Sequence, residues 1–163
     1  MEEKELIKLT PEQLTDMGIC PTCLDRKYNG AIFGDYTNRR IYSDKDIDCS
    51  FVFKPRAEGH MVIITQQHFQ DMSEAPDYIN EKIIRYARQF MKIIKEVYKC
   101  ERVYLSTMCD GPVNHYHVQL LPRYSYERRG AKNFIKPTQD YVFQKEKFEK
   151  IKNFIYEYSK KDL

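Results

Sequence analysis

The 163-residue sequence predicts an α+β domain, with a mostly antiparallel sheet, one long packing helix and a C-terminal helix. Three observations support this fold class. Short apolar segments bounded by turn residues, typical of strands, occur within residues 31–65. A long amphipathic segment follows at residues 78–99, and two more strand-like segments lie beyond it with only a Gly-Pro turn between them. Residues 1–163 fit the size of a single domain that folds without covalent crosslinks.

The elements before the long helix are short. Thr10 is placed to cap a helix that begins at Pro11, and Gly18 is placed to end it. A tight cysteine knuckle, Cys20 to Cys23, comes next. After the knuckle we expect four strands, at residues 31–33, 40–42, 49–53 and 59–65.

The helix at residues 78–99 is the clearest element. Its apolar side chains recur at steps of three and four residues, which predicts a buried stripe packed across the sheet. The residues of that stripe are Ile79, Ile83, Ala87, Phe90, Ile94 and Val97. After it we expect strands at residues 102–108 and 114–121, the second closed by Pro122, and a final amphipathic helix at residues 139–160.

The composition limits the classes of function. Lys and Arg exceed Asp and Glu by three (27 against 24), an excess that helps to attract a phosphate-bearing small molecule but is too small to indicate nucleic acid as the partner. No segment approaches the roughly 18 apolar residues of a membrane span, and the charged start, MEEKELIK, lacks the apolar segment of a signal peptide. Five cysteines, an odd count, fit a reducing compartment better than a paired disulfide framework. We therefore expect a cytoplasmic protein with no membrane partner.

Polar side chains share one face of the last expected strand. His115, His117 and Gln119 point the same way because successive side chains of a strand alternate, whereas Tyr116 and Val118 point into the core. A solvated sheet face is the simple alternative, but such faces usually carry Lys, Glu and Thr. Two imidazoles and an amide instead indicate a functional face.

An imidazole on such a face can act as a nucleophile toward phosphorus. A covalent phosphoramidate divides one difficult displacement into two easier ones. The other ring nitrogen must be held by an acceptor, which fixes the tautomer and the angle of attack, and donors must surround the phosphate oxygens. Gln119, two residues from His117 on the same face, is placed to supply such a donor.

Cys20 and Cys23 form a second candidate site. Such cysteines can be a redox pair, half of a zinc site, or neither. A redox pair normally begins a helix in a βαβ unit, whereas this pair precedes the sheet and has a proline inside it, so the redox interpretation is the weaker one. Zinc needs four ligands, and His68 and His115 are the best candidates among the four histidines. His60 is expected to be a structural residue near the start of a strand.

The motif from His115 to Arg123, with alternating histidines and apolar residues ending in Pro-Arg, resembles the signature of the histidine-triad (HIT) superfamily. The segment from Ile41 to Ile64, followed by His68, resembles the earlier sheet region of that superfamily. Together the resemblance spans about residues 19–124, in the right order and spacing. It implies a HIT-like fold.

The resemblance also divides the single domain into a core and two flanking segments. The core covers about residues 19–124, residues 1–18 form an N-terminal helical extension, and residues 125–163 form a C-terminal tail and helix. Homodimers are frequent among histidine-triad proteins. We therefore expect a homodimer that uses the long helix and the sheet edge.

The third position of the triad is Gln119 rather than histidine. This HxHxQ motif resembles the branch that contains galactose-1-phosphate uridylyltransferase and diadenosine tetraphosphate phosphorylase, which transfer nucleotidyl groups. The resemblance implies that His117 is the nucleophile and that Gln119 holds the phosphoryl oxygens or orients the imidazole. It also implies a structural zinc ion (Zn2+). The ligands of that ion would be Cys20, Cys23, His68 and His115.

The sequence departs from the superfamily pattern in two places. Members often carry an acidic residue three positions before a proline, where it grips the ribose hydroxyls. Here that position is Val52, so another residue such as Asp48 would hold the ribose. The glycine-rich stretch before the triad is compressed to residues 110–114. The candidate phosphate ligands that remain are Ser106, Thr107, Asn114 and Arg123.

Three functions from different classes follow from these residues. The first is a nucleotidyl transferase or nucleotide phosphohydrolase that acts on a nucleotide sugar or dinucleoside polyphosphate through a covalent histidine–nucleotidyl intermediate. The second is a non-catalytic, zinc-stabilised nucleotide sensor or adaptor, motivated by Val52. The third and weakest is a zinc-stabilised nucleic-acid-binding module, motivated by the basic and aromatic residues 124–163.

Overall fold

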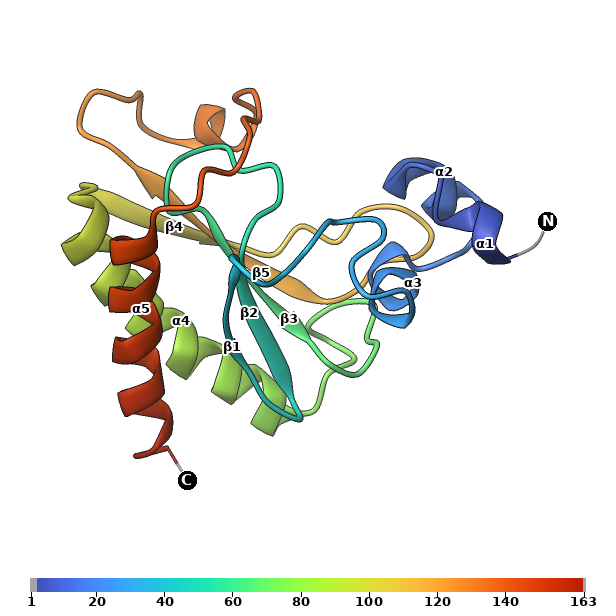
Figure 1. Cartoon of the computed structure of the whole chain (residues 1–163), viewed down its shortest axis with the longest axis horizontal. Coiled ribbons are helices and arrows are strands. Elements are labelled where there is room, and N and C mark those ends of the chain that lie inside the picture. Colours follow the sequence, from blue (N-terminus) through green and yellow to red (C-terminus); the bar gives the residue numbers. More distant parts are fainter. Residues whose placement is uncertain (1–2, 163) are drawn as a thin grey trace.

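The computed structural model describes residues 3–162 and confirms the α+β fold class (Figure 1). Five strands form one antiparallel sheet in the order β1-β2-β3-β5-β4. The strands are β1 (Arg40–Ser43), β2 (Ile47–Phe51), β3 (Met61–Thr65), β4 (Arg102–Ser106) and β5 (His117–Arg123). Because β3 and β5 are antiparallel neighbours, the segment after β3 and the segment before β5 meet at the same end of the sheet.

Figure 1 shows α4 and α5 together on one side of the sheet and the short helices α1, α2 and α3 grouped away from them. The long helix α4 packs against β3, β4 and β5, and the C-terminal helix α5 packs on α4 and β1. Helix α3 contacts the end of β3 and the segment before β5. The helices are α1 (Glu3–Leu6), α2 (Pro11–Asp16), α3 (Pro21–Lys27), α4 (Asp77–Tyr98), the 3-10 helix η1 (Ala131–Phe134) and α5 (Lys145–Ser159).

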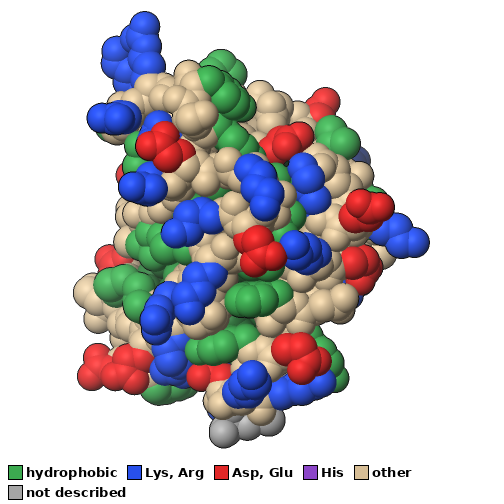
Figure 2. Space-filling view, turned by 90° about the vertical axis from the view of Figure 1, so that its left-hand side faces the viewer, with side chains coloured by type: hydrophobic (Ala, Val, Ile, Leu, Met, Phe, Trp, Pro, Cys, Tyr) green, Lys and Arg blue, Asp and Glu red, His purple; other side chains and the backbone are tan. Residues whose placement is uncertain are grey.

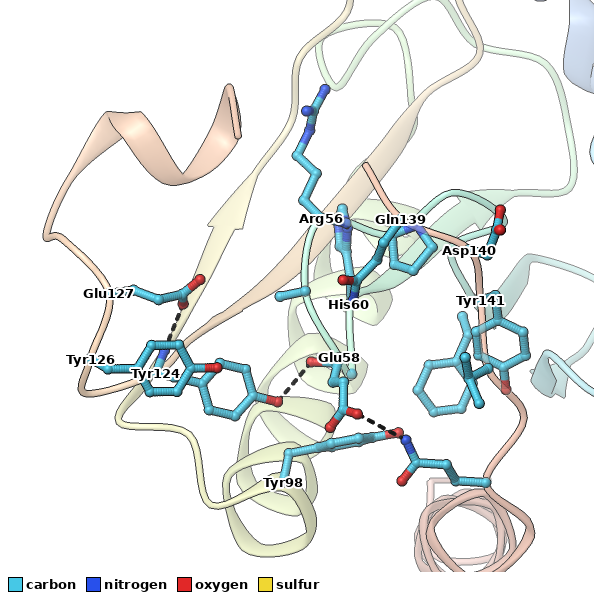
Figure 3. A pocket seen from close by; sticks show the side chains of 16 residues that line it. Arg56, Glu58, His60, Tyr98, Tyr124, Tyr126, Glu127, Gln139, Asp140 and Tyr141 are labelled. Atoms are coloured by element: carbon cyan, nitrogen blue, oxygen red, sulfur yellow. Dashed lines mark hydrogen bonds between the residues drawn. The ribbon is translucent and has the colours of Figure 1, made fainter. Parts of the chain in front are cut away.

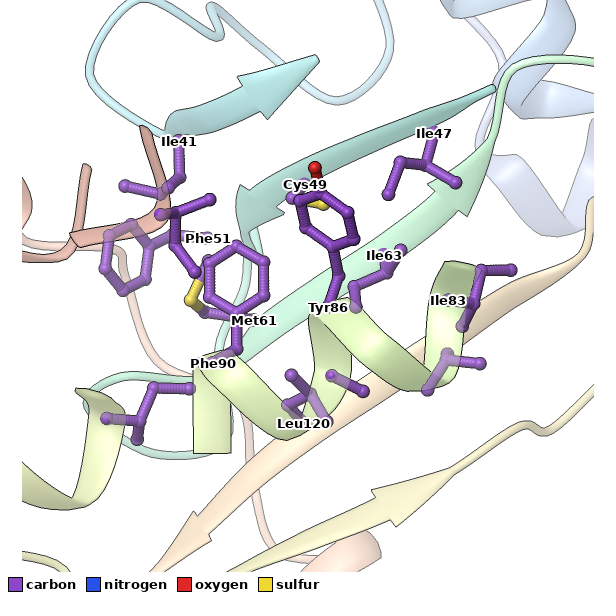
Figure 4. Packing of buried hydrophobic residues seen from close by; sticks show 14 of the residues in the cluster. Ile41, Ile47, Cys49, Phe51, Met61, Ile63, Ile83, Tyr86, Phe90 and Leu120 are labelled. Atoms are coloured by element: carbon purple, nitrogen blue, oxygen red, sulfur yellow. The ribbon is translucent and has the colours of Figure 1, made fainter. Parts of the chain in front are cut away.

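The hydrophobic core lies between the sheet and the helices α4 and α5 (Figure 4). Met61 and Ile63 of β3 point toward α4, where they meet Ile83 and Phe90 of its buried stripe. Each fully buried side chain of this size stabilises the fold by roughly 1.5–3 kcal/mol. The alternate residues of β3 are half-buried on the opposite face. That opposite face is therefore free to carry the polar side chains of β5.

The prediction of a strand at residues 31–33 is wrong. These residues form turns around the buried carboxylate of Asp25, whose Oδ1 accepts hydrogen bonds from the N–H groups of Ile32 and Phe33 at 2.8 Å each. The side chains of Ile32 and Phe33, whose apolar character predicted a strand, line a cavity instead. A tertiary contact from α3 outweighs local strand propensity here.

The strand expected at residues 114–121 begins at His117 and continues through Pro122, so the prediction that Pro122 closes it is wrong. The backbone carbonyl of Arg123 faces β4, where it accepts a hydrogen bond from the N–H of Glu101. Backbone groups of successive strand residues point to opposite sides, so the nitrogen of Pro122 points away from β4. The pairing of β5 with β3 has already ended at Leu120. Because Pro122 has no N–H, it cannot donate a hydrogen bond, but no neighbouring strand has a carbonyl there that needs one.

The other expected elements are found with shifted ends. The long helix is displaced by one residue, the strand at residues 102–108 ends at Ser106, and the final helix begins only at Lys145. Thr10 caps α2 as predicted. Its side chain accepts a hydrogen bond from the backbone N–H of Gln13 at 3.2 Å, and the Gln13 side chain accepts one from the backbone N–H of Thr10 at 2.9 Å.

The surface near α5 carries mixed charge. Figure 2 shows Lys and Arg side chains on this side of the molecule with Asp and Glu side chains between them. Exposed ion pairs such as that between Lys150 and Glu96, at 2.8 Å, contribute little to stability. Their mixed signs also create no single strong field. Within residues 3–162, no helix is both long and apolar enough to span a membrane.

Candidate functional site

The four predicted metal ligands come together at one end of the sheet. Cys20 caps α3, Cys23 lies in its first turn, His68 follows β3, and His115 precedes β5. Their ligand atoms all lie within 4.8 Å of one another. The Sγ atom of Cys23 lies 3.4 Å from Nδ1 of His68 and 3.4 Å from Nδ1 of His115, and Cys20 Sγ lies 3.5 Å from His115 Nδ1.

These separations fit a zinc ion. Zinc bonds of about 2.3 Å to sulfur and about 2.0–2.1 Å to nitrogen, at tetrahedral angles, place a sulfur about 3.6 Å from a nitrogen. The sulfur–nitrogen distances of 3.4–3.5 Å are close to this value. Two sulfurs with two imidazole nitrogens are also a common donor set of structural zinc.

The ring of His115 is held in the orientation that a metal ligand needs. Its Nε2 lies 2.7 Å from the carbonyl oxygen of Thr65, so Nε2 carries the proton and Nδ1 presents its lone pair to the sulfurs. Burial lowers the pKa of His115 to about 4, which keeps the ring neutral. Arg26 of α3 donates to the same carbonyl and to that of Gln66, both at 2.8 Å, and this joins α3 to the end of β3.

The tight turn from Cys20 to Cys23 opens helix α3, with Cys20 as its cap and Cys23 in its first turn. Cys20 Sγ accepts a hydrogen bond from the backbone N–H of Cys23 at 3.4 Å. Burial, together with the neighbouring Cys20, raises the pKa of Cys23 to about 11. The sheet beside them is antiparallel and forms no βαβ unit. The arrangement favours the metal interpretation over the redox interpretation.

His117 is the first residue of β5 and is half-buried on the face away from α4. Its Nδ1 lies 2.8 Å from the carbonyl oxygen of His115. Since a carbonyl oxygen only accepts, Nδ1 carries the proton and the lone pair of Nε2 is free. The fold therefore holds His117 in the tautomer that a nucleophile requires.

Gln119 is oriented by His60, which the sequence predicts to be a structural residue. The backbone N–H of Arg56 donates to Nδ1 of His60 at 3.1 Å, so the proton of His60 is on Nε2. That Nε2 lies 3.0 Å from Oε1 of Gln119 and donates to it. The amide nitrogen of Gln119 is thereby left to donate elsewhere. The contact between His60 and Gln119 depends on the register of β3 against β5. Val62 pairs with Gln119, and His60 lies two residues before Val62 and therefore on the same face.

The stability of the protein is expected to fall as the pH drops below about 6.5, because His60 is held neutral. Burial, with Arg56 and Lys136 adding to it, lowers the pKa of His60 from 6.5 to about 4. The unfolded chain binds this proton at a higher pH than the folded chain, so stability is complete above pH 6.5 and is lost progressively toward pH 4. By about pH 5 the expected loss is about 2 kcal/mol.

Urea unfolding at about pH 7.5 and about pH 5 measures this effect. A His60→Gln variant is the control, because it lacks the titrating ring and keeps an amide donor. The wild type should lose about 2 kcal/mol more than the variant between the two pH values. Equal losses would show that His60 titrates normally.

His60 also borders a second cavity of about 560 Å3 (Figure 3). Several polar groups that line this cavity are already paired with each other. The hydroxyl of Tyr124 donates to the carbonyl oxygen of Glu58 at 3.0 Å, and the amide of Gln144 donates to the Glu58 carboxylate at 3.1 Å. Such a cavity offers few free groups to a ligand.

The expected phosphate ligands near the triad differ in availability. The Ser106 hydroxyl is buried and has no hydrogen-bond partner, and Ser106 pairs with Gln119 in the sheet. The Thr107 hydroxyl donates to the carbonyl oxygen of His117 at 2.9 Å. Asn114 is bound through its backbone and its side chain to Gln70. Of these three, Ser106 has the hydroxyl that is free to bind a phosphate oxygen.

The structure does not bring Arg123 or Asp48 to the triad. Arg123 lies at the far end of β5, about 20 Å from His117 at the usual rise per strand residue. Its guanidinium is buried and pairs with Glu101 at 2.8 Å. Asp48, the suggested ribose ligand, is buried and pairs with Arg40 at 2.7 Å. Neither side chain lines the cavity beside His117.

A cavity of about 470 Å3 opens beside His117 and Gln119 on the face of the sheet away from α4. This volume is within the range of small-ligand sites. Most of its wall is apolar. The apolar side chains come from the turns before β1, from the end of β2 and the segment after it, and from β3: Ile32, Phe33, Phe51, Val52, Phe53, Val62 and Ile64.

Solved structures with similar folds carry names that refer to nucleotides or zinc. A zinc-bound histidine triad family protein from Mycobacterium smegmatis matches with a TM-score of 0.59 and 15% identity, over 74% of this chain and 86% of that one. A hypothetical histidine triad nucleotide-binding protein from Sulfolobus tokodaii strain 7 matches with a TM-score of 0.55 and 20% identity, over 73% of this chain and 81% of that one. The diadenosine triphosphate hydrolase of Plasmodium falciparum, in complex with cyclomarin A, matches with a TM-score of 0.56 and 15% identity, over 74% of this chain and 78% of that one. At these identities the likeness shows the fold alone.

A family model described as the HIT domain matches residues 34–126, which is more than half of the chain. No curated protein was found to match the sequence. The matched region contains all five strands, the long helix and the triad, whereas Cys20 and Cys23 precede it. By this match, together with its fold, the chain belongs to the HIT domain family, the histidine-triad proteins.

Proposed function

We propose that this protein is a nucleotidyl transferase or nucleotide phosphohydrolase that acts through a covalent histidine–nucleotidyl intermediate on His117. One observation carries the proposal: Nδ1 of His117 donates to the carbonyl oxygen of His115 at 2.8 Å, which leaves the lone pair of Nε2 free beside a ligand-sized cavity. A neutral imidazole in that state is a competent nucleophile toward phosphorus.

The proposed reaction has two displacements. In the first, Nε2 of His117 attacks the α-phosphorus, an N–P bond forms, and the P–O bond to the leaving nucleoside phosphate or sugar phosphate breaks. In the second, water or another acceptor attacks phosphorus, the N–P bond breaks, and the ring becomes neutral again; the proton of an attacking water passes to solvent. The carbonyl of His115 stabilises the positive charge on the ring between the two steps.

Gln119 and Ser106 are the proposed donors to the phosphoryl oxygens. His60 occupies Oε1 of Gln119, so the amide nitrogen is the atom left to donate. The Ser106 hydroxyl has no partner within the fold and lies opposite Gln119 in the sheet. Donors fixed in advance are effective because they need no reorganisation as charge develops.

A structural zinc ion is part of the proposal. Cys20, Cys23, His68 and His115 would hold it, and their spacing and donor types fit zinc. When bound, the ion would supply a rigid tetrahedral crosslink between α3 and the ends of β3 and β5. His115 is both a proposed ligand and the residue whose carbonyl orients His117. The crosslink would thus keep the nucleophile in place.

The names of the fold neighbours support the substrate class. One is called nucleotide-binding and another a diadenosine triphosphate hydrolase. We therefore propose a nucleotide sugar or a dinucleoside polyphosphate as the substrate. We also propose a cytoplasmic location, in keeping with the free cysteines, and a homodimer through α4 and the edge strand β4. Light scattering that gives a monomer mass would overturn the dimer.

A non-catalytic nucleotide sensor is the second candidate. The observation in its favour is Val52, which lines the cavity where family members often carry an acid. A sensor would bind a nucleotide tightly and release no product from any substrate of a broad panel. The enzyme proposal expects product.

Intact-protein mass spectrometry after a rapid quench tests the mechanism. The zinc-loaded protein is mixed with dinucleoside polyphosphates and nucleotide sugars, beside a His117→Asn control. We expect a mass increase of one nucleoside monophosphate in the wild type and none in the control. Product formation without any adduct on the shortest timescale, at an equal rate in the control, would contradict the covalent mechanism.

A further inference from the structure

The cavity beside His117 contains a polar side chain that the fold leaves without a partner. Ser50 of β2 lines this cavity, is 1% exposed, and its hydroxyl oxygen makes no hydrogen bond within residues 3–162. Ser50 pairs with Val62, and Val62 pairs with Gln119, so Ser50 lies on the same face of the sheet as the triad. Burying a hydroxyl without a partner costs free energy, and a ligand that pairs with it removes that cost.

Several other polar groups around the cavity are already paired within the fold. Tyr36, Arg39 and Lys54 have internal partners, and so has Oε1 of Gln119. The partners of the first three are Asp25, the carbonyl groups of Phe33 and Phe51, and Asp140. Within the described part of the chain, no carboxylate lines this cavity.

This distribution of groups suits a planar base better than a ribose diol. The rings of Phe33 and Phe53 and the side chains of Val62 and Ile64 give the cavity apolar walls, against which a heterocycle can pack. The two hydroxyls of a ribose are donors that need acceptors. A site without a carboxylate to accept from both hydroxyls discriminates only weakly against an analogue that lacks one of them, because no charged group of the site is left unpaired.

We propose that the Ser50 hydroxyl binds the nucleobase of the substrate through one hydrogen bond, while the ribose hydroxyls stay unbound. The cavity then selects its nucleotide by the base and binds ribonucleotides and 2′-deoxyribonucleotides alike. A hydroxyl both donates and accepts, so Ser50 can pair with either kind of group on a base edge. This inference rests on the proposed function, since it assigns the nucleotide to the cavity beside His117.

Titration calorimetry with nucleoside monophosphates tests the inference, because these ligands are bound without turnover. The zinc-loaded wild type is titrated with the monophosphates of the four common bases, each in its ribose and 2′-deoxyribose form. For the base that binds best, we expect the two Kd values to agree within about threefold. A preference of more than about tenfold for the ribose form would overturn the inference.

A Ser50→Ala variant supplies the second measurement. Its affinity for the preferred base should fall by about two- to tenfold, because one hydrogen bond is lost. Without ligand it should be at least as stable as the wild type, because an unpaired buried hydroxyl has been removed. A merely structural serine would give the opposite stability change and no loss of affinity.

Ser43→Ala is the matched control. Its hydroxyl accepts a hydrogen bond from Gln66 at 2.9 Å and lies outside the cavity beside His117, so binding should not change. Unchanged affinity in Ser50→Ala, with nucleotides still bound by the wild type, would overturn the role of Ser50 and leave the proposed function standing. Failure of the wild type to bind any nucleotide would overturn both.

Discussion

Replacing His117 by asparagine is expected to lower kcat by about four orders of magnitude or more. The substitution removes the lone pair of Nε2, the nitrogen that the hydrogen bond from Nδ1 to the carbonyl of His115 leaves free. No covalent intermediate can then form, and any residual rate comes from substrate binding and from the phosphate donors alone. Steady-state turnover of the best substrate in the panel measures the effect.

Folding and binding controls separate this loss from a general defect. The His117→Asn variant should unfold at the same urea concentration as the wild type. It should also bind a nucleoside monophosphate with a Kd within about threefold of the wild-type value, because His117 forms only one part of the cavity wall. A variant that retains kcat within about tenfold would show that another group attacks phosphorus.

Replacing Cys23 by serine is expected to abolish zinc binding and to lower the free energy of unfolding by more than about 4 kcal/mol. The Sγ atom of Cys23 approaches both His68 and His115 at 3.4 Å, so its loss breaks the proposed crosslink at its centre. Elemental analysis gives the zinc content per chain, and urea unfolding with and without a chelator gives the stability.

Cys109→Ser is the matched control for this substitution. Cys109 is a free cysteine in the loop between β4 and β5 and is outside the ligand cluster. Its replacement should change neither the zinc content nor the response to a chelator. The zinc proposal is wrong if Cys23→Ser retains one zinc per chain at wild-type stability.

The parts of the site that could be predicted from the sequence depend on local periodicity and on residue counts. The shared face of His117 and Gln119 follows from alternation along a strand, whatever the strand packs against, whereas His115 precedes β5. Four-coordinate zinc and a chain with four histidines make His68 and His115 the best candidates to join the two cysteines, and the resemblance to histidine-triad proteins implies the same set. The long helix followed from its apolar stripe.

The parts that could not be predicted depend on which segments meet. Asp25 holds residues 31–33 in turns, and nothing within those three residues signals a buried carboxylate from another segment. The sequence offers Arg123 as a phosphate ligand, but its guanidinium pairs with Glu101, the residue just before β4. The contact of His60 with Gln119 requires the pairing of β3 with β5 and its register, which alternation along one strand does not give.

The ligand cluster also constrains the order in which the chain can assemble. Cys23 and His115 are 92 residues apart, and closing a flexible loop of that length costs about 4 kcal/mol of chain entropy. Pairing of β3 with β5 brings His68 and His115 together first. The entropy cost of bringing the cysteines to them is therefore lower once these strands have paired. During synthesis the two thiols emerge long before that point and stay exposed to oxidants. Metal capture would thus be a late event in folding, and a metal-loaded chain is one in which β3 and β5 have already paired.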